Sequence, residues 1–77
     1  MTAKQIAHIV ELGAAVSIDC RSFSLNNLKV LARAAKASGA KLTLTHICFT
    51  YLGVTEIIGE CPAAQLCLDF TDQEPED

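Results

Sequence analysis

Four cysteines and two histidines are the side chains of this sequence best suited to bind a metal ion or to form disulfides. Successive cysteines are 28, 13 and 6 residues apart, at positions 20, 48, 61 and 67, so no pair has the close spacing of a zinc knuckle or a redox dithiol. No secretory signal precedes them, and we expect reduced, mostly buried thiols in a cytoplasmic protein. We expect no metal site. Two alternatives stay open: a metal site that gathers His46 with Cys20 and Cys48, and a metal or redox sensor that uses the cysteines.

No motif places a Ser, Cys or His beside both a base and an orienting acid, which is the setting that nucleophilic catalysis needs. The glycines stand singly, at positions 13, 39, 53 and 59, so there is no glycine-rich loop to hold a phosphate. We therefore expect a protein that is not an enzyme and that uses no cofactor.

Length and composition predict one small domain with a thin aliphatic core. The chain has 77 residues, of which 51% are hydrophobic but only 5% aromatic. No apolar run reaches the roughly 18 residues of a membrane span, so we expect no membrane partner. The net charge of −3 and the lack of aromatic residues among the basic ones argue against nucleic acid as a partner.

An apolar pattern that recurs three times along the chain predicts three helices. Each set has the i, i+3, i+4, i+7 spacing of one helix face, and the second and third sets are offset by 26 at every position: Ile6, Ile9, Val10 and Gly13; Leu28, Leu31, Ala32 and Ala35; Val54, Ile57, Ile58 and Cys61. Thr2, Ser24 and Thr50 stand at the helix starts, where a hydroxyl accepts from the first-turn amides. The apolar residue before each cap has the spacing of a hydrophobic staple, pairing Met1 with Ile6, Phe23 with Leu28 and Phe49 with Val54.

A strict alternation of apolar and polar residues follows each predicted helix, at 16–20, 42–46 and 66–70, and indicates three half-buried strands. Strands joined by a helix are nearly always parallel and adjacent. We therefore predict an α/β fold of three α-β repeats over residues 1–70, with a three-stranded parallel sheet in order 1-2-3 and three helices on one face. The inward strand residues would be Val16, Ile18, Cys20, Leu42, Leu44, His46, Leu66, Leu68 and Phe70. Residues 71–77, TDQEPED, are expected to form a disordered acidic tail.

The repeated unit of about 25 residues resembles leucine-rich repeats in architecture, although Ser22 and Cys48 stand where that family has its asparagine ladder. The segment LNNLKVLARAAKASGAKLTL, residues 25–44, locally resembles the helix and strand of STAS domains, the anti-sigma-factor antagonists. The phosphorylated segment of that family would fall on RSFSL, which implies phosphorylation of Ser24 or Ser22 only if the likeness extends to function. Overall, the chain resembles small uncharacterised bacterial βα-repeat proteins, a likeness that implies a fold but no function.

Two surfaces are candidates for partner binding. The sheet face without helices would carry six side chains, Ser17, Asp19, Thr43, Thr45, Cys67 and Asp69, either as a partner surface or as a face solvated by small polar groups. The second predicted helix would carry a basic ridge formed by Lys29, Arg33 and Lys36, for which a solvated helix face is the alternative.

We therefore predict a non-catalytic protein–protein interaction module that binds a protein partner or a second copy of itself. A thin core and exposed strand edges favour self-association. Two alternatives stay open: a small acidic regulator of the type that mobile elements encode, which covers a functional surface of its partner, and a signalling switch similar to STAS domains.

Overall fold

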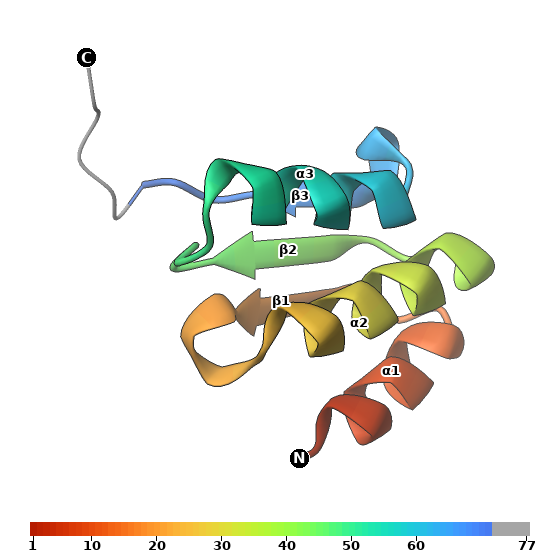
Figure 1. Ribbon diagram of the computed structural model, residues 1–77. Coiled ribbons are helices and arrows are strands. Elements are labelled where there is room, and N and C mark those ends of the chain that lie inside the picture. Colours follow the sequence, from red (N-terminus) through yellow and green to blue (C-terminus); the bar gives the residue numbers. More distant parts are fainter. Residues whose placement is uncertain (72–77) are drawn as a thin grey trace.

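The computed structural model describes residues 1–71 and shows three helix-strand units in one layered α/β fold (Figure 1). The elements follow in the order α1 (Ala3–Glu11), β1 (Val16–Asp19), α2 (Leu25–Ser38), β2 (Leu42–Thr45), α3 (Tyr51–Glu60) and β3 (Leu66–Leu68), with short 3₁₀ turns at Cys20–Ser22 and Ala63–Gln65. The strands are parallel in the order β1-β2-β3, and the three helices form one layer on one face of the sheet. The predicted fold class is confirmed. Apart from Thr71, the predicted acidic tail lies outside the described residues.

All three helices begin as the cap residues predict. The hydroxyls of Thr2, Ser24 and Thr50 each accept a hydrogen bond from the backbone amide three residues later. Gln5 also accepts from the Thr2 amide, which completes a capping box at α1. The predicted staple at Met1 is wrong, because this side chain is 84% exposed and has little to pack against. The other two apolar residues that precede a cap do pack against the core, Phe23 and Phe49.

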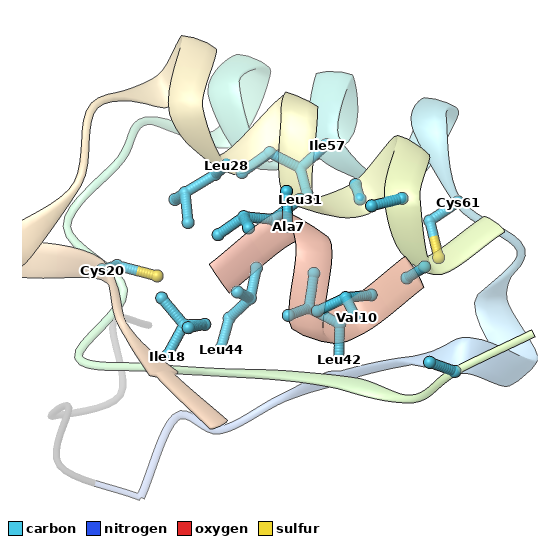
Figure 2. Packing of buried hydrophobic residues seen from close by; sticks show 14 residues of the cluster. Ala7, Val10, Ile18, Cys20, Leu28, Leu31, Leu42, Leu44, Ile57 and Cys61 are labelled. Atoms are coloured by element: carbon cyan, nitrogen blue, oxygen red, sulfur yellow. The ribbon is translucent and has the colours of Figure 1, made fainter. Parts of the chain in front are cut away.

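The core is centred on the middle unit (Figure 2). Every core position predicted for α2 is fully buried: Leu28, Leu31, Ala32 and Ala35. Leu42 and Leu44 of β2 are buried beneath this helix. In the outer units the predicted stripe is only partly covered, since α1 and α3 each have a neighbouring helix on one side alone. Burial therefore falls off from the middle of the molecule towards both ends.

Each strand is shorter than the alternation predicts, and His46 does not point inward. Its backbone φ is +50°, in the left-handed region, which ends β2 at Thr45 and breaks the alternation. The His46 ring lies beside polar groups instead, with Nδ1 3.3 Å from Thr45 Oγ1 and 3.7 Å from a carboxylate oxygen of Asp19. Ile47 takes the place against the core. The inward assignment of Phe70 is also wrong, because β3 ends at Leu68 and Phe70 is exposed.

Among residues 1–71, no helix combines the length and the apolar character that crossing a bilayer would require.

Candidate interaction surface

The structure brings the six predicted open-face residues together in two rows across the sheet. Ser17, Thr43 and Cys67 are in register on β1, β2 and β3. Asp19 is paired with Thr45 in the next row, and Asp69 follows β3, where its amide donates to the Leu44 carbonyl over 2.9 Å. Because successive side chains of a strand point to opposite faces, both rows lie opposite the helices.

The acidic groups of the second row are engaged within the chain. Asp19 accepts hydrogen bonds from the Arg21 amide and from its guanidinium, the shortest at 2.8 Å, and these bonds lower the pKa of the Asp19 carboxyl to about 2. Asp69 accepts from the amide and hydroxyl of Thr71, which lowers the pKa of the Asp69 carboxyl. Most of the charge on this face is therefore balanced or hydrogen-bonded locally.

Sequence reasoning did not place His46 with this row. The sign that could have found it is the residue type, since histidine is enriched among the non-glycine residues that adopt a positive φ. Within the described chain, no three His, Cys, Asp or Glu side chains group closely enough to hold a metal ion. What His46 contributes is a polar edge beside Asp19, at the carboxyl end of the strands.

The predicted basic ridge lies along the seam between α2 and α3. Lys29 Nζ is 3.5 Å from a carboxylate oxygen of Glu56, and Arg33 Nε is 2.6 Å from one of Glu60. The Arg33 hydrogen bond raises the pKa of the guanidinium and lowers the pKa of the Glu60 carboxyl. Lys36 is exposed nearby and also favours the charged form of Glu60. The ridge is thus matched by acids from α3, a pairing that a single-helix pattern could not reveal.

The four cysteines are free and divide into two pairs by burial. Cys20 and Cys61 are buried as predicted, and desolvation raises the pKa of both thiols, that of Cys20 to about 11. Cys48 and Cys67 are exposed, so the prediction of mostly buried thiols is wrong for this pair. Cys67 stands at the centre of β3, on the face without helices.

Of the two serines named by the STAS likeness, Ser24 has a structural role. Its Oγ accepts from the Asn27 amide at the start of α2 over 3.2 Å. Ser22 ends the 3₁₀ turn that follows β1 and is exposed.

An apolar flank of α3 is uncovered, although the same positions of α2 are covered. Leu25 lies next to Gly53 of α3, and Lys29 and Arg33 form ion pairs with α3, so these residues mark the side of α2 that faces α3. By helical spacing, Leu28 and Ala32 lie next to them. The repeat offset of 26 residues places Tyr51, Val54 and Ile58 on the corresponding side of α3; we call these three residues the α3 flank. On α2, Leu25 is half-buried and Leu28 and Ala32 are fully buried. On α3, Tyr51 is 82% exposed, Val54 is half-buried and Ile58 is 40% exposed. No α-helix within residues 1–71 follows α3 to cover them.

The outer edge of β3 is open on the same side of the molecule. The Asp69 amide bonds to β2, so by the alternation along a strand the Leu68 N–H and the C=O groups of Leu66 and Leu68 point away from β2. The Leu66 N–H donates to the Ala63 carbonyl in the preceding 3₁₀ turn. In the described part of the chain, no strand lies beyond β3. Exposed strand edges were predicted, but the α3 flank was missed because the helical period assigns Ile58 to the core. Within residues 1–71, no further helix-strand unit follows β3 to cover this flank.

No pocket is formed by residues 1–71. Comparison of the chain with protein-family models, with curated proteins and with solved structures finds no match.

Proposed function

We propose that the protein is a non-catalytic protein–protein interaction module that self-associates through the end of the molecule formed by α3 and β3. One observation carries this proposal: Tyr51 and Ile58 of the α3 flank are exposed, whereas their equivalents on α2, Leu25 and Ala32, are half-buried and fully buried. An uncovered helix flank beside an unpaired strand edge is a surface that a partner protein can complete.

The two ends of the helix layer differ in a way that supports this choice. In repeat proteins, terminal units have a polar outer side that caps the core. The exposed residues of α1 are all polar, namely Lys4, Gln5, His8 and Glu11, and Leu12 just after the helix is the apolar exception. The outer side of α3 carries the flank residues instead. The first unit therefore has the character of a cap, and the last unit has that of an interface.

Charge also favours contact between two copies at this end. The acids of α3, Glu56 and Glu60, are directed towards α2 and paired there with Lys29 and Arg33. The α3 flank itself carries no ionisable carboxylate or amine. Two copies of a chain with a net charge of −3 can thus meet flank to flank without bringing like charges into contact.

Sedimentation velocity from low to high micromolar concentration tests self-association. We expect the wild-type chain to shift from monomer to dimer, and Ile58→Glu to stay monomeric, because it places a carboxylate in the contact. Leu52→Glu is the matched control: Leu52 is 72% exposed on the same helix, but the helical turn directs it to solvent rather than to the flank. A wild-type monomer throughout this range, or equal effects of both substitutions, would overturn the proposal.

A further inference from the structure

The α3 flank and the β3 edge lie on one side of the molecule, so a single partner can cover both. A partner that covered the flank alone would leave the Leu68 N–H and the outward C=O groups of Leu66 and Leu68 unpaired with protein. One that paired with the strand alone would leave Tyr51 and Ile58 in water. The partner that fits must present a strand edge and a helix flank in the same relative positions, and a second copy of this chain does so.

We propose that two copies pair through β3 as antiparallel strands, about a twofold axis at Cys67, to form one six-stranded sheet. This inference rests on the self-association proposed above and specifies its geometry. The partner is a second copy, and the dimer is closed, since each β3 edge and each α3 flank is used once.

Symmetry decides the strand direction. A twofold axis along the strands would pair the two β3 edges in parallel but would turn the second helix layer to the opposite face, and the two α3 flanks would not meet. An axis perpendicular to the sheet makes the strands antiparallel and keeps both helix layers on the same face. Only the second arrangement covers the flank and the edge together, so the exposed flank points to antiparallel pairing.

The length of β3 decides the register. The strand spans Leu66–Leu68, and centring the axis on Cys67 is the register that pairs all three residues. The Leu68 N–H of each copy then donates to the Leu66 carbonyl of the other, while the Leu66 N–H keeps its bond to the Ala63 carbonyl. Asp69 falls opposite Gln65 of the second copy, so no two carboxylates face each other along this pair of strands.

This register brings the two Cys67 side chains together on the open face. Directly opposite residues in a non-hydrogen-bonded antiparallel pair have Cα atoms about 4.5 Å apart, and a disulfide needs a Cα separation of about 4.4–6.8 Å. Cys67 is exposed and accessible to an oxidant. The pairing therefore predicts that two Cys67 thiols can join in a disulfide between copies.

Oxidation of a Cys48→Ser variant with diamide tests the geometry, because Cys67 is then the one exposed thiol and the other two are buried. Two thiols lose two protons and two electrons to diamide, which is reduced to the hydrazine, and one S–S bond forms. At a concentration where the noncovalent dimer is populated, we expect a covalent dimer on a non-reducing gel. We expect it to disappear when Cys67→Ser or Ile58→Glu is added.

A relocated thiol is the control for random collision. Cys48→Ser, Cys67→Ser and Ser17→Cys together place an exposed thiol in the same row of the open face, but on β1 at the far edge. We expect at least a tenfold slower covalent dimerisation of this variant. Equal rates, or a sedimenting dimer that Cys67 does not cross-link, would overturn the β3 pairing while self-association stands. Loss of the noncovalent dimer itself would overturn both proposals.

Discussion

Two adjacent residues of α3 with the same side chain test how the end of the molecule is covered. Ile57 is 1% exposed in the core, and Ile58 is 40% exposed on the α3 flank. Truncating a fully buried Ile to Ala costs about 2–5 kcal/mol, because it removes packing and leaves a cavity. For a chain of 77 residues, the whole free energy of unfolding is about 4–12 kcal/mol. Ile57→Ala should therefore remove a large part of the stability at any protein concentration.

Ile58→Ala should behave differently because its site is open. Complete burial of an Ile side chain is worth about 1.5–3 kcal/mol, of which the three-fifths already buried amount to about 1–2 kcal/mol. The exposed two-fifths amount to about 0.6–1.2 kcal/mol per copy, available only when a second copy covers them. Because both copies lose this contribution, Ile58→Ala should raise the dissociation constant of the dimer by about 7- to 50-fold.

Urea unfolding followed by far-ultraviolet circular dichroism, at protein concentrations below and above the dimer transition, measures both effects. We expect Ile58→Ala to lower the free energy of unfolding by an amount that grows with protein concentration, since association stabilises the wild-type fold by mass action. The loss in Ile57→Ala should exceed it at low concentration. Should Ile57→Ala fail to fold, the Val substitutions at both positions give the same comparison, with a cost of about 0.5–1.5 kcal/mol at the buried site. The flank is refuted as the interface if the wild-type urea midpoint rises with protein concentration while the decrease in unfolding free energy caused by Ile58→Ala stays constant.

Two further predictions concern the fold and its pH dependence. Gly59→Ala should stabilise the chain by about 0.5–1 kcal/mol in the same unfolding assay, because Gly59 lies within α3 with open space around an added Cβ; Gly39→Ala, at φ +77°, should destabilise it, and the reasoning fails if both shift in the same direction. The pKa of Asp19 is lowered by Arg21 from 3.8 to about 2 in the folded chain, so its contribution to stability is present above pH 4 and is lost as the pH falls towards 2. In the Asp19→Asn variant, the urea midpoint should fall less steeply as the pH drops from about 4 to 2. An equally steep fall would contradict the role of Asp19 in this pH dependence.

Much of the fold could be predicted because each unit carries its own local signals. The hydroxyl caps at Thr2, Ser24 and Thr50 and the alternating strands are short-range features. The parallel order of the strands follows from their helical connections. However, the spacing of apolar residues along a helix shows only which residues share a helix face. It does not show which element packs against that face. Ile58 belongs to the apolar stripe of α3 and yet is exposed, because its cover would have to come from an element beyond α3.

The candidate surface could be predicted only in part for the same reason. The six open-face residues follow from alternation and register, and the structure brings them together. The ion pairs of Lys29 and Arg33 join residues 27 positions apart, so they depend on how α2 and α3 pack. The left-handed backbone at His46 ends the alternation of apolar and polar residues in the second strand. Histidine also occurs within strands, so the residue type alone does not predict this end. Such a break depends on the surrounding structure rather than on the local pattern.

The short last strand also has a consequence for folding. In an array where each unit contacts only its neighbours, local opening starts at the ends, and the middle unit exchanges its amide hydrogens last. β3 has three residues and, within the described residues 1–71, is held by one neighbouring strand, whereas β2 is held by two. A second strand on its free edge would raise its protection against hydrogen exchange to that of an interior strand. Assembly would then be the step that completes the folding of the last unit.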